Sequence, residues 1–527
     1  MLFNSPEFIF IFLPLTVWIF YTLGEKTHSR WAITWLVGAS LFFYSWWNPL
    51  YLGLLVFSML FNYYLGALLN GKVRLPIHNK LLLIFGVGIN LGLIGYFKYG
   101  NFFLSNVNSL LSTNFNLQQI ILPLAISFFT FQQIAYLVDA YRGETKEYNF
   151  LNYCLFVSFF PQLIAGPIVH HQEVLPQFAQ KSLYRFNYEN LEVGLTIFCL
   201  GLFKKVALAD TVAVYVNPVF NAAEAGGEIA FFQAWGGALA YTLQLYFDFS
   251  GYSDMAIGAA RMFGIKLPLN FNSPYKSVNI IDFWRRWHIT LSRFLRDYLY
   301  IPFGGSRKGK VRRYFNLMMT MLLGGLWHGA AWNFVLWGGL HGIYLVINHQ
   351  WHLVRQFLGH DLNKSSWWGR ILGGGVTFIA VVVGWVFFRA QSTQAALVIL
   401  KGGIGLYGVS IPERLAVLLN IKSILSVMGV NFTPGTIENF VLPYICYLSL
   451  LFIAWFLPNT QEWMADYKPA LSEEKINHAV SGKGYPLWKT LKWKPNWPCA
   501  LIIGTFAVIS FKTFLSAMPS DFLYFNF

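Results

Sequence analysis

Charged residues are scarce in this chain, since only 12% of its 527 residues are Asp, Glu, Lys or Arg. Soluble domains usually carry about 25%. Hydrophobic residues make up 56% of the chain and aromatic residues 19%, and aromatic side chains are enriched where a membrane meets water. The shortage of charge excludes an ordinary soluble domain. It predicts an all-α protein that crosses a membrane several times.

Other features of common enzyme classes are missing as well. The four cysteines lie scattered in apolar runs, which excludes a disulfide framework and a thiolate metal site. No HExxH motif indicates a zinc protease, and no GxSxG motif indicates a serine hydrolase. No repeat of fixed period and no low-complexity tail divides the chain. We therefore predict a single membrane-embedded domain over 1–527, with a core over 1–400 and an additional helix pair around a polar loop over 440–516.

Long apolar runs are abundant, and a helix needs about 20 apolar residues to cross the hydrocarbon core. Several runs are short or interrupted by Gly or Pro, which is typical of re-entrant segments shielded from lipid by protein. We expect about eleven transmembrane helices, with re-entrant and amphipathic helices, around a central tunnel. The candidate spans are 7–24, 29–47, 49–69, 80–99, 118–140, 149–166, 191–216, 230–247, 314–334, 335–350, 371–390, 441–457 and 500–516.

Positive charge exceeds negative charge, with 38 Lys and Arg against 23 Asp and Glu. In a soluble protein this balance would suggest a nucleic-acid partner. Here twelve Lys and Arg against two Asp gather in residues 261–313, and positive loops of membrane proteins face the cytoplasm. We therefore expect 261–313 on the cytoplasmic side, and we predict membrane lipid and no nucleic acid as partner.

Within this basic segment, residues 281–305 predict an amphipathic helix at the membrane surface. An i,i+4 pair joins Asp282 and Arg286. One interpretation is an anchor for lipid headgroups. The other is a site for an anionic donor, either the phosphates of coenzyme A or of a phosphopantetheine arm, or an acidic carrier protein. The candidate donor-binding residues are Arg285, Arg286, Ser292 and Arg296, with His288 near the same face.

Two histidines stand in the apolar, glycine-rich run GGLWHGAAWNFVLWGGLHG, residues 324–342. Ionisable residues inside a membrane are costly and usually serve function. If the run were one helix, His328 and His341 would lie about 140° apart, and Trp332 would flank His328 instead. With no third ligand, a metal site is not expected. His341 is interpreted as a packing residue, and the glycines as clearance for a thin substrate.

A neutral imidazole is a general base suited to direct transfer of a group to a bound hydroxyl. No serine or cysteine nucleophile adjoins His328 in the sequence. Asn333 or a Trp indole N–H is a candidate to stabilise an oxyanion. The polar patch that includes Asp248 and Ser250 is a candidate tunnel lining.

Several long motifs together resemble the membrane-bound O-acyltransferase family, and most of all its bacterial alginate O-acetyltransferase branch. The resemblance extends over most of residues 1–390, and the 440–516 helix pair also fits that branch. The motifs are RRWHITLSRFLRDYLYIPFGG, LLGGLWHGAAWNFVLWGGLHG, FNSPEFIFIFLPLT, SFFPQLIAGPI, LQLYFDFSGYSDMAIG, LPLNFNSPYKS and GWVFFRA.

The resemblance implies a multi-pass enzyme of the bacterial inner membrane, with His328 as catalytic histidine and His288 as a second important position. It implies no permanently bound cofactor. An acetyl thioester, as acetyl-CoA or on a carrier protein, arrives from the cytoplasm. An extracytoplasmic partner acetyltransferase completes transfer to polysaccharide hydroxyls. Alternatives are a flippase of lipid-linked sugars, or transfer of D-alanine or a fatty acyl group.

Overall fold

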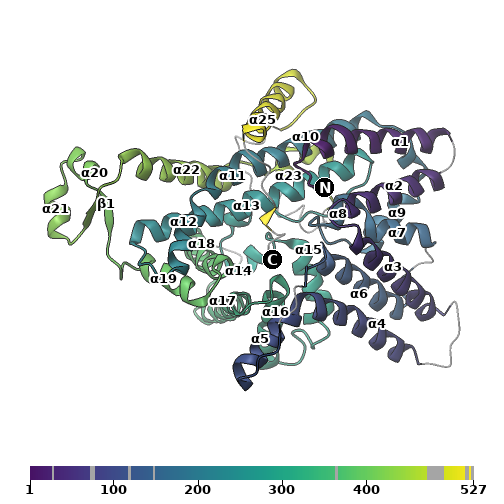
Figure 1. Ribbon diagram of the computed structural model, residues 1–527, viewed down its shortest axis with the longest axis horizontal. Coiled ribbons are helices and arrows are strands. Elements are labelled where there is room, and N and C mark those ends of the chain that lie inside the picture. Colours follow the sequence, from purple (N-terminus) through teal and green to yellow (C-terminus); the bar gives the residue numbers. More distant parts are fainter. Residues whose placement is uncertain are drawn as a thin grey trace. The chain divides into compact units, whose positions relative to one another are not determined.

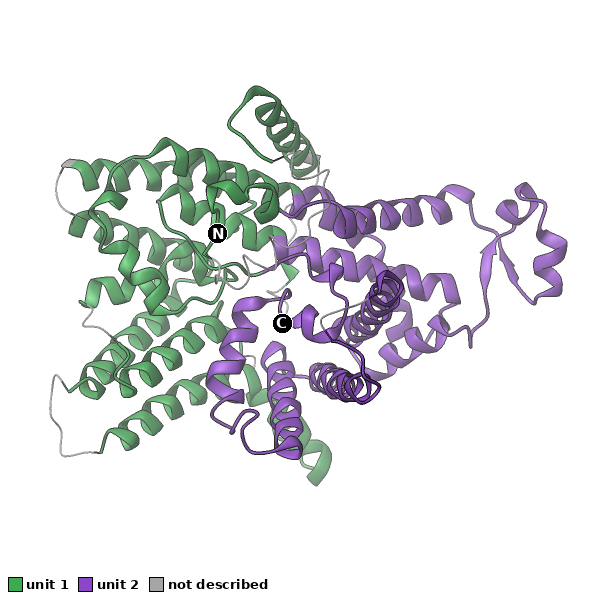
Figure 2. Ribbon diagram, turned by 180° about the vertical axis from the view of Figure 1, so that it is seen from behind, with its two compact units in different colours: residues 1–203, 251–270, 460–526 green, residues 204–250, 271–459, 527 purple. Residues whose placement is uncertain are grey.

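The computed structural model of the chain is almost entirely helical (Figure 1). It describes residues 1–26, 29–71, 78–116, 120–145, 149–362, 366–471, 492–516 and 522–523. The chain divides into two compact units (Figure 2). Unit 1 comprises residues 1–203, 251–270 and 460–526, and unit 2 comprises residues 204–250, 271–459 and 527. The single domain over 1–527 stays a prediction.

Unit 1 is a set of packed helices in which α1 packs on α2, α4 on α6, and α10 on α25. Its elements are η1 (Glu7–Phe12), α1 (Leu13–Lys26), α2 (Ser29–Ser45), α3 (Leu50–Leu69), α4 (Asn79–Ile94), η2 (Gly95–Tyr99), α5 (Gly100–Leu111), α6 (Ile126–Tyr141), α7 (Phe150–Ser158), α8 (Phe160–Leu163), α9 (His171–Phe178), η3 (Lys181–Tyr184), α10 (Tyr188–Phe203), α23 (Thr460–Trp463), η7 (Ala465–Tyr467) and α25 (Trp497–Ser516). The long helix α13 (Phe231–Met262) contributes residues to both units.

Every residue that the sequence predicts for the site belongs to unit 2. Its elements are η4 (Lys204–Ala209), α11 (Asp210–Ala213), α12 (Val216–Glu224), η5 (Pro274–Lys276), α14 (Ile280–Trp284), α15 (Ile289–Leu295), η6 (Arg296–Tyr300), α16 (Lys310–His328), α17 (Trp332–Phe357), α18 (Trp367–Arg389), α19 (Thr393–Gly403), β1 (Ser410–Pro412), α20 (Glu413–Leu418), α21 (Lys422–Val427), β2 (Asn431–Thr433) and α22 (Ile437–Phe456). The two short strands pair in parallel, with Ser410 opposite Asn431.

Six of the described helical segments are long and apolar enough to cross a membrane: Glu7–Glu25, Leu50–Leu69, Asn79–Leu111, Trp367–Arg389, Ile437–Phe456 and Trp497–Leu515. The all-helical, membrane-spanning class predicted from the sequence is therefore confirmed. Two other predicted spans are broken, because 149–166 divides into α7 and α8, and 191–216 passes from α10 into the π-helix η4. The predicted spans 230–247 and 335–350 correspond to parts of the longer helices α13 and α17. The predicted polar loop lies partly outside the described residues, since 472–491 are not described.

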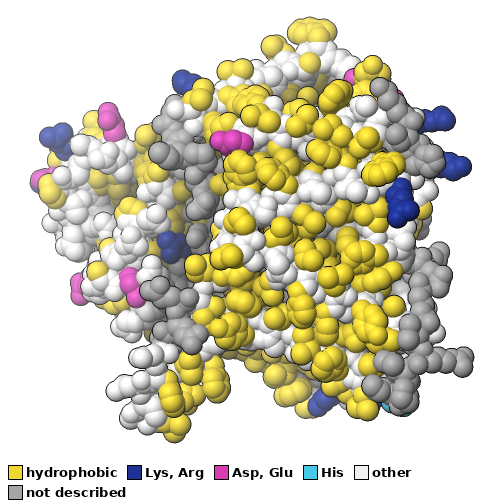
Figure 3. All heavy atoms as spheres, turned by 45° about the vertical axis from the view of Figure 1, so that its right-hand side comes forward, with side chains coloured by type: hydrophobic (Ala, Val, Ile, Leu, Met, Phe, Trp, Pro, Cys, Tyr) yellow, Lys and Arg dark blue, Asp and Glu magenta, His cyan; other side chains and the backbone are white. Residues whose placement is uncertain are grey.

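Apolar side chains cover the outside of the helices as well as their interior. Leu50, Phe57 and Leu60 of α3 and Leu81 and Phe85 of α4 are all exposed. Figure 3 shows a face with extensive hydrophobic surface and few charged side chains. Exposed apolar area on this scale marks a surface that meets lipid rather than water.

Glycine sets the spacing of the antiparallel helices α16 and α17. A Cβ added at Gly325 would meet the carbonyl oxygen of Phe334 and would lie 3.1 Å from the Cα of Gly338. At Gly342 a Cβ would lie 2.8 Å from the sulfur of Met318. Small residues at such positions let two helix backbones approach closely. The glycines thus serve helix packing, and the interpretation of Gly325 as clearance for a substrate is wrong.

Replacing Gly325 with Ala should lower the stability of the protein by about 1–3 kcal/mol, the usual cost of overpacking. The added methyl would press on backbone atoms of α17, which cannot move aside as a flexible side chain would. Thermal unfolding of the purified protein in detergent measures the effect. The matched control is Gly339→Ala, since a Cβ there would lie 3.5 Å from Leu322. Equal melting temperatures for the two variants would contradict this packing role.

Candidate active site

His328 is the last residue of α16, and the chain turns directly after it. Gly329 and Ala331 adopt extended backbone conformations, which end α16 and allow α17 to begin at Trp332. The imidazole is 5% exposed. Its ring centroid lies 4.9 Å from that of Trp327, 5.1 Å from Trp337 and 5.1 Å from Phe388. His328 therefore sits buried among aromatic rings that come from α16, α17 and α18.

His288 lies between α14 and α15 and is fully buried. Its ring contacts Phe249 at 4.9 Å, Phe271 at 6.3 Å and Trp327 at 6.3 Å. Burial lowers its pKa to about 3, so the imidazole is neutral at physiological pH. Trp327 thus contacts both His288 and His328. The two histidines predicted for the site therefore belong to one group of aromatic contacts, which Trp327 connects.

The backbone of His288 is left-handed, with φ +44° and ψ +53°. This conformation is uncommon for residues other than glycine, although His, Asn and Asp adopt it more readily than most. This conformation interrupts the helix that the sequence predicts over 281–305. The segment instead forms α14, a turn over 285–288, α15 and the π-helix η6. The expectation of one continuous amphipathic helix is wrong, because this turn directs His288 and Trp287 into the protein.

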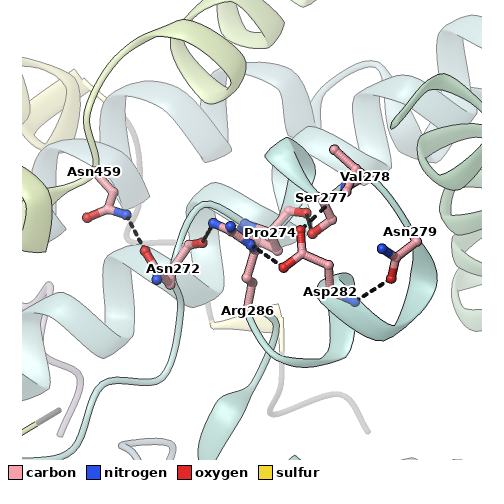
Figure 4. Close-up of polar contacts among 8 residues, drawn as sticks. All are labelled: Asn272, Pro274, Ser277, Val278, Asn279, Asp282, Arg286 and Asn459. Carbon is pink, nitrogen blue, oxygen red and sulfur yellow. Dashed lines mark hydrogen bonds and ion pairs between the residues drawn. The ribbon is translucent and has the colours of Figure 1, made fainter. Parts of the chain in front are cut away.

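A hydrogen-bonded network holds the turn before His288 (Figure 4). The side chain of Asn279 caps α14 by accepting a hydrogen bond from the backbone N–H of Asp282 at 2.9 Å. Asp282 in turn pairs with the Nε of Arg286 at 2.9 Å, as the i,i+4 spacing predicts. Arg286 also donates to the carbonyl of Asn272, whose own N–H donates to the carbonyl of Arg286. The side chain of Asn459 donates to that of Asn272 at 3.1 Å.

The four predicted donor-binding residues differ in their surroundings. Arg285 is exposed, whereas Arg286 is half-buried and engaged in the network. Ser292 is half-buried and makes a long 3.5 Å hydrogen bond to the carbonyl of Trp287. Arg296 forms a two-pronged pair with Asp297, at 2.7 and 3.1 Å. Arg285 and Arg296 are both exposed, and Arg296 is already paired with an acidic side chain.

Trp332 and Asn333 begin α17 and differ in burial. Trp332 is 58% exposed at the start of α17. Asn333 is buried, donates to the carbonyl of Ala390 at 2.8 Å and accepts from the hydroxyl of Thr393 at 2.7 Å. These bonds tie α17 to the connection between α18 and α19. The geometry favours a structural role for the Asn333 amide over an oxyanion-stabilising one.

Asp248 and Ser250 are both buried on α13. Asp248 forms an ion pair at 2.6 Å with Lys205, which also pairs with Asp210 at 2.9 Å. Sequence reasoning missed Lys205, although two adjacent lysines inside the apolar run 191–216 are a signal for a buried ion pair. Lys205 lies on η4, and π-helical turns often mark functional sites.

The structure also corrects the relation of the two histidines in the run 324–342. Because the chain turns at Gly329–Ala331, His328 and His341 lie on different helices. Both rings contact Trp337, at 5.1 and 4.9 Å. Among the residues that the structure describes, no group of three His, Cys, Asp or Glu side chains is arranged to hold a metal ion.

Similarity to known proteins identifies the family of this chain. Residues 140–383, which include His288 and His328, match the membrane-bound O-acyltransferase (MBOAT) family. A peptidoglycan O-acetyltransferase of Helicobacter pylori is 48% identical over 438 residues, covering 78% of this chain and 81% of the relative. The chain belongs to the MBOAT family. It is an O-acetyltransferase of this family and a multi-pass membrane protein.

Further MBOAT relatives broaden the comparison. A probable alginate O-acetylase AlgI of Pseudomonas putida is 42% identical over 403 residues, covering 75% of this chain and 79% of the relative. A teichoic acid D-alanyltransferase of Streptococcus thermophilus is 29% identical over 280 residues, covering 50% of this chain and 68% of the relative. The resemblance that the motifs indicated is therefore confirmed, and the MBOAT relatives include a peptidoglycan O-acetyltransferase and a probable alginate O-acetylase.

Proposed function

We propose that this MBOAT enzyme moves an acetyl group from a cytoplasmic thioester across the bacterial inner membrane, toward hydroxyls of a cell-wall polysaccharide or exopolysaccharide on the other side. The observation that carries the proposal is the position of His328, a buried imidazole at a helix end surrounded by three aromatic rings. Low polarity around an imidazole favours its neutral form, which can accept a proton. The relatives that acetylate peptidoglycan and alginate support the choice of polymer class.

In the proposed reaction, His328 accepts the proton of the acceptor hydroxyl as its oxygen attacks the thioester carbonyl. The new O–C bond forms and the C–S bond breaks, so that the acetyl group moves to oxygen and a thiolate leaves. The proton then passes from the imidazolium to the thiolate, which leaves His328 neutral for the next cycle. No step consumes an oxidant or a metal ion.

The remaining candidate residues serve the donor and its path in this proposal. Arg285, exposed beside α14, would pair with a donor phosphate. His288 would position the thioester through its neutral imidazole, held by the network around Asp282 and Arg286. Asp248 and Ser250 would line the tunnel that joins the two sides of the membrane. An acyl carrier protein or acetyl-CoA would supply the donor, and a partner acetyltransferase outside the membrane would receive the acetyl group.

Deleting the gene should abolish base-labile acetate in one polymer of the host. Acetate released by mild alkali is measured separately from purified peptidoglycan and from secreted polysaccharide. Restoring the wild-type chain should return the acetate, and the polymer that responds is the acceptor. Unchanged acetate in both polymers after deletion would refute the proposed function.

A further inference from the structure

Three aromatic side chains form a triangle beside His328. The ring centroids of Trp284 and Trp337 lie 5.8 Å apart, those of Trp284 and His341 5.2 Å, and those of Trp337 and His341 4.9 Å. Trp284 ends α14, and the other two residues stand one helical turn apart on α17. Trp337 and His341 are almost completely buried. We call these three residues the indole–imidazole triad.

The polar atoms of the triad lack hydrogen-bond partners among the described residues. This applies to both ring nitrogens of His341 and to the indole N–H groups of Trp284 and Trp337, and all four atoms are buried. Buried polar atoms in proteins are nearly always hydrogen-bonded, so each exception calls for an explanation such as strain, a catalytic role, or a water molecule or ion at the site. Four such atoms on three touching rings indicate a place built for a hydrogen-bonding ligand.

The neighbours of the triad restrict the chemistry of that ligand. The other rings around His341 belong to Phe283, Tyr344 and Trp385, so no charged side chain is among its ring contacts. The Nε2 of His341 faces Gly384, where an added Cβ would lie 2.9 Å away. The Nδ1 and the two indole N–H groups are then available to the ligand. A neutral amide fits this set, because its oxygen accepts from indole N–H groups and its N–H donates to an imidazole nitrogen.

The position of the triad points to the donor. Trp284 directly precedes the exposed Arg285 in the chain, and Trp337 contacts His328. The triad thus connects the cation proposed for a phosphate with the base proposed for the thioester. A pantetheine arm has the same order, with a phosphate at one end, amides in the middle and the thioester at the other end. We propose that Trp284, Trp337 and His341 bind an amide of the donor's pantetheine arm. This inference rests on the proposed function and replaces the packing role predicted for His341.

The test compares two donors with the purified full-length protein in detergent. One donor is S-acetylpantetheine, and the other is its analogue in which the amide nearest the sulfur is an ester and so lacks the N–H. The wild type should prefer the amide donor by about tenfold in kcat/KM, the worth of one typical hydrogen bond. His341→Phe should lose about tenfold with the amide donor and show no preference between donors. Trp284→Phe should be weaker with both donors and keep the preference.

Control variants and a second readout separate this inference from a structural role. His352→Phe, on the same helix and outside the triad, should behave as wild type. His341→Phe should melt no lower than wild type, because an apolar ring replaces an unpaired polar one. Acetyl-CoA and an acetylated carrier protein share the pantetheine arm. If His341→Phe lowers kcat/KM with both of these donors, the arm itself is the recognised group. A loss with only one of them would assign the effect to the rest of that donor.

Two results would overturn the inference. One is a His341→Phe enzyme that keeps the wild-type preference for the amide, which is also what a water held by the triad would give. The other is a wild type that shows no preference. Failure of the proposed function looks different, because then neither donor gives His328-dependent transfer. In that case calorimetric binding of pantetheine to wild type and His341→Phe decides, and equal affinities would overturn the inference.

Discussion

Replacing His328 with Gln is expected to reduce acetyl transfer at least 100-fold while the protein still inserts at normal levels. Glutamine fills similar space and can donate a hydrogen bond, but it cannot accept a proton at neutral pH. General-base catalysis by a positioned side chain contributes about 10²–10⁴-fold to the rate. Acetyl transfer to polymer by membranes that contain equal amounts of the protein measures the loss.

The matched control for this prediction is His349→Gln on α17. The side chain of His349 lies 3.1 Å from a guanidinium nitrogen of Arg313 and is not among the ring contacts of His328. It should transfer acetate at a rate close to that of wild type. Transfer by His328→Gln within threefold of wild type would remove His328 from the reaction.

Replacing Lys205 with Met is expected to destabilise the protein by about 3–5 kcal/mol, the usual effect of removing one partner of a buried ion pair. Lys205 lies 2.6 Å from Asp248, and both side chains are nearly inaccessible to solvent. Without the ammonium group, the buried Asp248 carboxylate would lose this ion pair. Unfolding in detergent, followed by temperature, measures the change.

Two further variants test the cause of that loss. Lys204→Met changes the neighbouring lysine, which is only half-buried, and should have a small effect. The double variant Lys205→Met with Asp248→Leu removes both charges and should recover most of the stability. A double variant as unstable as Lys205→Met alone would show that the ion pair is not the source of the loss.

The class of fold could be predicted from the sequence because it depends on local signals. Apolar runs reveal helices, and an ionisable residue such as His328 inside such a run is conspicuous. The turn at His288 was missed, since a left-handed residue leaves no trace in hydrophobic periodicity. That turn separates α14 from α15, so a regular helical pattern over 281–305 placed His288 on the polar face, whereas its side chain is buried.

Contacts between distant segments also could not be predicted from the sequence. The triad joins Trp284 to Trp337 and His341 across more than fifty residues, and nothing in either segment alone indicates the other. Lys205 and Asp248 likewise pair across two helices. The roles of Asn333 and of the glycines in α16 and α17 depend on which backbone lies opposite, and composition does not reveal that.

The left-handed backbone at residue 288 also limits which amino acids evolution can place there. Asn, Asp and Gly tolerate this conformation, whereas β-branched residues resist it strongly. The backbone conformation therefore restricts which substitutions are tolerated at residue 288, independently of any chemical role of the side chain. Asn is the replacement that keeps both the turn and a hydrogen-bonding side chain, so homologues that carry Asn at this position would be expected to retain the same loop. An alanine scan, by contrast, would confuse the loss of the imidazole with a distortion of the turn.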